Sequence, residues 1–144
     1  MAQISQILKD ISGFDRGYRE KKLAPLGLTP RQAAFLREIG AAPGISQEQL
    51  TGRIGVNKSN VARQVAALEE EGYIERRSCG KDKRVLRLYP TEKTLALLPG
   101  IHQVMDSWEQ LLVAELTEQE QQTLETMLLR LRDCALSAAK EGEQ

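Results

Sequence analysis

Five side chains between residues 58 and 64 are of the types that proteins use to recognise DNA. They are Lys58, Ser59, Asn60, Arg63 and Gln64. Asn and Gln can form two hydrogen bonds with the edge of adenine, and Arg can do the same with guanine. Lys and Ser close to the first turn of a helix are better placed to hold a phosphate group. If these residues share one helix face, that face could read base pairs in a DNA groove.

A strongly basic stretch, RRSCGKDKRVLR, covers residues 76–87 of a chain whose formal net charge is zero. It contains six basic residues, Arg76, Arg77, Lys81, Lys83, Arg84 and Arg87. Asp82 is its one acid, so the local charge is +5, which indicates an acidic partner. We expect Arg76, Arg77, Lys81, Lys83 and Arg84 to contact the DNA backbone or minor groove. Asp82 is expected to pair with Arg84 and orient its guanidinium. The alternative is that the basic stretch binds no partner and is only a solvated part of the surface.

The cysteines could carry out a second kind of chemistry, the redox reactions of a thiol. Cys79 lies between Arg77 and Lys81, and nearby positive charge favours the reactive thiolate. Redox sensing by Cys79 is one hypothesis, and an incidental exposed cysteine is the other, since no second cysteine is close in sequence. Cys134 and His102 add too few ligands for a disulfide framework or a zinc site. We expect no metal, no cofactor and no catalytic group, and therefore not an enzyme.

Capping signals and apolar spacing predict the helices that position these residues. They are expected at 4–18, at 30–40 with Thr29 and Gln32 as a capping box, at 47–54 with Ser46 and Gln49, and at 58–71 after Asn57. In the last of these, Val61, Val65 and Leu68 recur at i, i+4 and i+7. These three residues should face the core, which would turn the polar residues of 58–64 outward.

Two strand-like runs, YIERRS at 73–78 and RVLRLY at 84–89, flank the turn-rich CGKDK and predict a β-hairpin that carries the basic stretch. Thr91 is expected to cap a following helix, and Thr117 with Glu120 to cap a final one. Pro99 and Gly100 interrupt the segment between these two helix starts. It is either one long kinked helix or two pieces, and we favour the kinked helix.

The predicted fold is mainly α with a small β-hairpin wing. Two short helices joined by a turn form a helix-turn-helix whose second member, about 58–71, can enter the DNA major groove, with the wing at about 73–90 beside it. Residues 29–99 would form the DNA-binding region. Residues 1–28 and 100–144 would form a helical dimerisation region, because the apolar stripes from Ile4 to Tyr18 and from Leu124 to Ala135 need a partner surface.

The segment SQEQLTGRIGVNKSNVARQVAALEEEGYIERR, followed by DKR and LYPTEK, resembles the winged helix-turn-helix of the MarR family of transcriptional regulators. Asp82 and Arg84 match the Asp-x-Arg motif of that family's wing, in which the Arg contacts DNA. One departure is Thr94, where the family often has Gly. The resemblance implies a homodimer with intertwined terminal helices, and a small aromatic or lipophilic effector that releases the DNA. The effector site stays unknown; Trp108 with Met105, Leu111 and Leu112 could line it, or could be core or interface.

Composition agrees with a soluble globular chain of 144 residues, 41% hydrophobic and 28% charged. With no signal sequence and no long apolar run, a cytoplasmic location is expected. A dimer would place two reading helices about one DNA turn, roughly 34 Å, apart and predicts a pseudo-palindromic site in double-stranded DNA. The competing hypothesis is a protein-interaction module whose basic hairpin docks an acidic protein.

Overall fold

The computed structural model describes residues 3–80 and 82–142, without the side chains of Cys79, Asp82 and Lys83. The elements in chain order are α1 (Gln3–Leu23), the 3-10 turn η1 (Ala24–Leu26), α2 (Pro30–Ala41), β1 (Ile45–Ser46), α3 (Gln47–Ile54), α4 (Lys58–Glu70), β2 (Ile74–Cys79), β3 (Asp82–Pro90), α5 (Glu92–Leu112) and α6 (Glu118–Glu141). The chain forms two compact units, one extending to Trp108 and the other beginning at Glu109. The predicted class, mainly α with a small β wing, is confirmed.

Side-chain caps set the start of each helix in the helix-turn-helix region. The Thr29 hydroxyl accepts from Gln32 N at 3.1 Å at the start of α2, and the Ser46 hydroxyl accepts from Gln49 N at 3.1 Å at the start of α3. In both cases the glutamine side-chain oxygen accepts a hydrogen bond from the main-chain N of the capping residue. Both predicted capping boxes are therefore confirmed. Gly55 ends α3 with φ at 77°, a left-handed conformation that glycine adopts without a Cβ clash.

The two helices that flank the helix-turn-helix and the wing in the chain, α1 and α5, are longer than their sequence signals. α1 continues past Tyr18 to Leu23, whose side chain is fully buried. α5 is one helix that contains Pro99, so the single-helix alternative is confirmed. Ile101 and Met105 on the same helix are buried. Burial of apolar side chains stabilises a helix and acts against the loss of the backbone hydrogen bond that proline removes.

The sheet has three antiparallel strands in the order β1-β3-β2. The predicted hairpin is β2 and β3, in which Arg76 pairs with Leu88 and Ile74 with Pro90. The short strand β1 was not predicted, because two residues are too few for a periodic signal. It adds Ile45 opposite Leu88, and both side chains are buried, so β1 joins the hairpin to the helical core.

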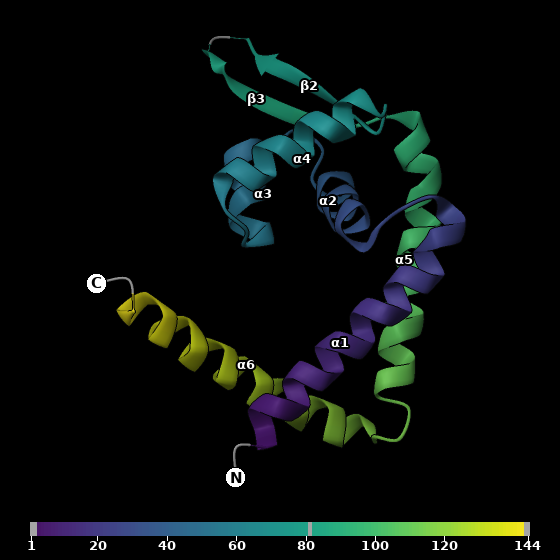
Figure 1. Cartoon of the computed structure of the whole chain (residues 1–144), viewed down its shortest axis with the longest axis vertical. Coiled ribbons are helices and arrows are strands. Elements are labelled where there is room, and N and C mark those ends of the chain that lie inside the picture. The colour runs from purple at the N-terminus through teal and green to yellow at the C-terminus, as the bar shows by residue number, and fades with distance from the viewer. Residues whose placement is uncertain (1–2, 81, 143–144) are drawn as a thin grey trace. The chain divides into compact units, whose positions relative to one another are not determined.

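One core lies beneath α4 and the sheet, and Figure 1 shows the β2–β3 hairpin (teal) running along α4. Val61, Val65 and Leu68 are fully buried, which confirms the inward face predicted for α4. α2 adds three large core side chains: Phe35, Leu36 and Ile39. This packing fixes which side of α4 can face outward.

Outside the core, apolar side chains of α1 and of α6 are exposed to solvent in the single chain. On α1 they include Ile4, Ile7 and Phe14, and Phe14 is 70% exposed. On α6, every described residue from Glu125 onward is exposed, including Leu128, Leu131 and Leu136. Cys134, also on α6, is a free and exposed cysteine in the single chain. Among the described residues, no helix combines the length and the apolar character needed to cross a membrane.

Candidate nucleic-acid interface

The outward face of α4 is built by one capped helix. Asn57 precedes α4, and its side-chain oxygen accepts from Asn60 N at 2.8 Å. Lys58, Ser59 and Arg63 are exposed, as the sequence predicted. Asn60 and Gln64 are half-buried, so they offer less surface to a partner than the fully outward positions expected for them.

Arg63 is held by a neighbour one helical turn away. Its Nη2 donates a hydrogen bond to Oδ1 of Asn60. Residues three apart on a helix are adjacent on its surface, so Asn60 can fix the direction of the Arg63 guanidinium. A side chain that is already ordered loses less conformational entropy on binding.

The first basic residue of the wing is joined to α4. Arg76 donates from Nε at 3.1 Å and from Nη2 at 2.9 Å to Oε1 of Glu69, and its main-chain N donates at 3.2 Å to Oε2 of Glu69. Hydrogen bonding with Arg76 lowers the pKa of the Glu69 carboxyl, and the same bonds raise the pKa of Arg76. Glu69 was not among the residues predicted from the sequence, because the local charge of residues 76–87 does not include the acids of the preceding helix.

The other described arginines of the hairpin also have local contacts. Arg77 lies 2.8 Å from Oε2 of Glu75 and stacks over the Tyr89 ring at 4.4 Å. Arg87 donates from Nη1 at 2.9 Å to the carbonyl oxygen of Gly44, just before β1. The basic stretch therefore presents less unpaired positive charge than its composition indicates.

The tip of the wing carries the remaining predicted contacts. Arg84 is exposed on β3. Lys81 and the side chains of Asp82, Lys83 and Cys79 lie outside the described residues, so the predicted Asp82–Arg84 pair and the Cys79 redox site are not described either.

Three residues around the start of α5 bind the turn between α4 and the wing. The Thr91 hydroxyl lies 2.7 Å from the Gly72 carbonyl oxygen, and the Lys93 ammonium lies 3.0 Å from that of Glu71. Thr94, the departure from the family pattern, is fully buried and donates at 2.6 Å to the Tyr73 carbonyl oxygen. These bonds join α5 to the base of the wing.

A hollow of about 300 Å³ lies in the first unit, where α1 and η1 meet α5. Its lining includes Tyr18, Lys22, Leu26 and Ser107. Tyr18 also stacks against Trp108 with ring centroids 5.1 Å apart, and α1 lies alongside α5 in Figure 1. Of the apolar set proposed around Trp108, Met105 is buried in the core, whereas Leu111 and Leu112 are exposed.

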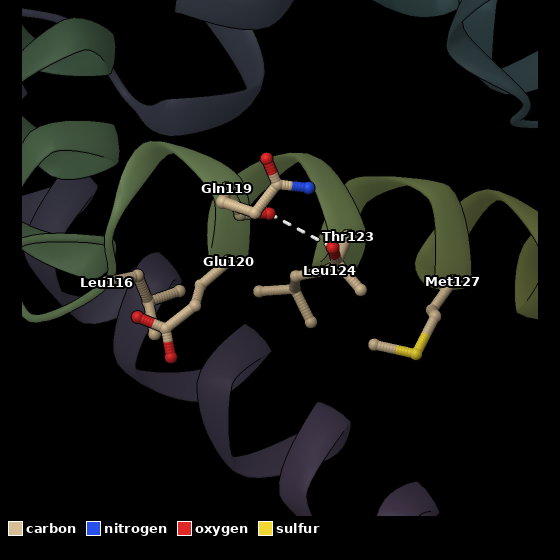
Figure 2. Close-up of a pocket in the computed structure, with 6 residues that line it drawn as sticks. All are labelled: Leu116, Gln119, Glu120, Thr123, Leu124 and Met127. Carbon is tan, nitrogen blue, oxygen red and sulfur yellow. Dashed lines mark hydrogen bonds between the residues drawn. The ribbon is translucent and has the colours of Figure 1, made fainter.

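A second hollow, of about 320 Å³, lies in the other unit on the apolar side of α6. Figure 2 shows Leu116, Leu124 and Met127 along it, with Thr123 donating at 3.0 Å to the Gln119 carbonyl oxygen. An open apolar hollow on a helix that is otherwise exposed is suited to the side chains of another protein surface. Within the described part of the chain, no group of three or more His, Cys, Asp or Glu is arranged to hold a metal ion.

Comparison with known sequences supports the family that the sequence resembles, the MarR family. The MarR family profile matches residues 26–85, which include α2, α3, α4 and most of the wing. The HTH-type transcriptional regulator BilQ of Clostridium symbiosum (strain WAL-14163) is 32% identical over 123 residues, 85% of this chain and 83% of the relative. The uncharacterized HTH-type transcriptional regulator YybA of Bacillus subtilis (strain 168) is 31% identical over 107 residues, 74% of this chain and 71% of the relative.

Comparison with solved structures supports the same family. The transcriptional regulator SlyA superposes with a TM-score of 0.86 at 29% identity, covering 92% of this chain and 93% of that one. A MarR structure gives a TM-score of 0.74 at 33% identity over 93% and 98% of the two chains. A mutant of MarR from E. coli complexed with operator DNA gives 0.81 at 25% identity over 90% and 93%. The winged fold, the two relatives above 30% identity and the profile together show that the chain belongs to the MarR family of transcriptional regulators and is not an enzyme.

Proposed function

We propose that this protein is a homodimeric, sequence-specific DNA-binding repressor that a small aromatic or lipophilic effector releases from DNA. The observation that carries the proposal is α4, whose apolar side is fully buried while Lys58, Ser59 and Arg63 face outward. A single helix fits the major groove, which is about 12 Å wide. The relative solved with operator DNA supports the proposed ligand.

In this proposal α4 reads the major groove. Arg63, oriented by Asn60, would bind a guanine edge, and Gln64 would bind an adenine edge at the margin of the helix. Lys58 and Ser59 lie in the first helical turn, where the helix dipole also favours a phosphate group. Base contacts from α4 would then provide the sequence preference.

The wing would lie over the adjacent backbone or minor groove. The residues proposed to approach DNA there are Arg77, Lys81, Lys83 and Arg84, and Asp82 would orient the Arg84 guanidinium. These contacts would add affinity for any DNA sequence, and that affinity would fall as salt concentration rises.

Dimerisation is proposed through the terminal regions, residues 1–28 and 100–144, with 29–99 as the DNA-binding region. The exposed apolar side chains of α1 and α6 support this, since monomeric proteins rarely leave such surfaces open. Two-fold symmetry would match a pseudo-palindromic site. The hollow lined by Tyr18 and Lys22 is the effector site we propose, and the protein would act in the cytoplasm.

The test is a titration of the purified protein into the duplex upstream of its own coding sequence and into a scrambled duplex, each at two salt concentrations. We expect binding to the upstream duplex to be at least about a thousandfold tighter and to weaken steeply with salt. If both duplexes bind equally weakly, selection from random sequences decides the question. Failure to enrich any sequence would overturn the proposal in favour of an acidic protein partner for the hairpin.

A further inference from the structure

We propose that Glu69 and Arg76 form a clamp that holds the wing at a fixed position relative to α4, and that Arg76 is a positioning residue that makes no contact with DNA. This inference rests on the proposed DNA-binding function. It changes the role expected for Arg76 from its sequence alone.

The geometry of the pair is specific. Both oxygens of the Glu69 carboxylate are used: Oε1 accepts from Nε and Nη2 of Arg76, and Oε2 accepts from the Arg76 main-chain N. One carboxylate on the helix therefore fixes both the side chain and the backbone of one residue on β2. A surface ion pair formed only between side-chain ends would leave the strand free to move.

The two side chains are 30% and 36% exposed, for Arg76 and Glu69 respectively. By contrast, the nearby pair of Arg77 and Glu75 is 61% and 54% exposed and joins neighbouring positions of the same strand. Only the first pair connects two different elements. It is also the better shielded of the two, so solvent screens it less.

The clamp lies at a position that controls the hairpin. Arg76 pairs with Leu88 in the sheet, and Leu88 is buried and pairs with Ile45 of β1. Arg84 is four residues from Leu88 toward the tip, which corresponds to about 13 Å of strand. A tilt of about 15° at the clamp would shift Arg84 by about 3 Å over that length, enough to break a hydrogen bond to DNA.

The ion pair between Arg76 and Glu69 also favours a positioning role for Arg76 over a contact with DNA. The guanidinium of Arg76 already has a carboxylate partner 2.9 Å away, so a phosphate group would have to displace Glu69. Arg76 would then displace no counterion from DNA, and it would add nothing to the salt dependence of binding.

The experiment compares Glu69→Ala, Arg76→Ala and the double variant with the control Glu70→Ala. Glu70 is the adjacent acid on α4 and is exposed. Removing an acid close to DNA should by itself strengthen binding, so Glu70→Ala should leave the Kd unchanged or lower it. If the clamp exists, Glu69→Ala and Arg76→Ala should each raise the Kd about threefold to fivefold, and the double variant should be no worse than either one.

The slope of log Kd against log salt concentration separates the two roles of Arg76. A positioning residue leaves the slope of Arg76→Ala equal to that of wild type, whereas loss of a phosphate contact reduces it by about 1. Tighter DNA binding by Glu69→Ala, or a reduced slope for Arg76→Ala, would overturn the proposal.

Amide hydrogen exchange without DNA tests the clamp independently of function. Exchange at the hairpin should be faster in Glu69→Ala and Arg76→Ala than in wild type, and unchanged in Glu70→Ala. Unchanged exchange in the first two variants would overturn the clamp even if wild type binds DNA. If exchange responds but wild type shows no sequence preference, the clamp stands and the DNA-binding function fails. Arg76→Lys keeps the charge but loses the planar fork, so it should show a smaller effect if Arg76→Ala does not fold.

Discussion

The hydroxyl of Thr94 donates a 2.6 Å hydrogen bond to the main-chain carbonyl oxygen of Tyr73, and the Thr94 side chain is fully buried. This bond connects the first turn of α5 to the residue just before β2. The Lys93 ammonium, 4.1 Å above the Tyr73 ring, reinforces the same junction. A threonine at position 94 therefore fastens the wing base to α5, which glycine could not do.

Replacing Thr94 with Val should reduce the free energy of unfolding by about 1–2 kcal/mol, because the shape is kept and the buried hydrogen bond is lost. Urea-induced unfolding at constant protein concentration measures this. Thr126→Val is the control, since its exposed hydroxyl donates only to the Gln122 carbonyl of the same helix, and it should change stability by less than about 0.5 kcal/mol. Equal losses in both variants would show that the Thr94 bond does not stabilise the junction.

Replacing Gly40 with Ala should destabilise the protein by up to about 1 kcal/mol, since a Cβ there would lie 2.7 Å from Cδ1 of Leu98 on α5 and the end of the Leu98 side chain would have to shift. Gly52→Ala is the matched control, because nothing lies within 4 Å of a Cβ at that helical position. It should be neutral or stabilise by up to about 1 kcal/mol, as alanine favours helix. The two shifts in unfolding midpoint must have different signs or sizes if the close approach of α2 and α5 is real.

Placing a charge on the apolar side of α6 should separate the proposed dimer. Leu131→Asp should give a particle of one chain mass, 16.1 kDa, by light scattering, whereas wild type should give about twice that mass. Gln122→Asp adds the same charge nine residues away, two and a half helical turns and so on the opposite face, and should remain dimeric. A dimeric Leu131→Asp would place the interface elsewhere.

Two arginines should differ in what they add to DNA binding. Arg84→Ala should weaken binding to all duplexes and lower the salt slope by about 1, as expected for loss of a phosphate contact. Arg63→Ala should reduce discrimination at one base pair by about 1–3 kcal/mol. Titrations against single-base operator variants measure both effects. Unchanged affinity and unchanged selectivity in both variants would refute the assigned interface.

The pair of Glu69 and Arg76 should make stability depend on pH. Because hydrogen bonding with Arg76 lowers the pKa of Glu69 in the folded state, the pair stabilises the fold above the ordinary carboxyl range, about 4.3, and loses this effect as pH falls through the lowered value. The difference in unfolding free energy between wild type and Glu69→Gln should be at most about 1 kcal/mol near neutral pH, since the pair is partly exposed. It should shrink toward acid pH, and in an Arg76→Ala background it should not vary in this way.

The sequence by itself determined the features that depend on short-range contacts. Capping residues act on amides three positions away, so the starts of α2, α3, α4 and α6 were predictable from Thr29, Ser46, Asn57 and Thr117. The spacing of Val61, Val65 and Leu68 likewise determined the buried side of α4, because helix periodicity is a local property.

Only the tertiary structure decided which groups meet across the turn at Gly72 and across the sheet. Strand β1 exists because Ile45 pairs with Leu88, 43 residues away in the chain, and no local pattern encodes that pairing. Glu69 reaches Arg76 because Gly72 reverses the chain with φ at 82°, which brings α4 and β2 side by side. Composition gave the hairpin its positive charge, but the folded arrangement assigned Arg76 a carboxylate partner from α4. Charge in a sequence is additive, whereas the interaction of charges depends on distances that only the fold determines.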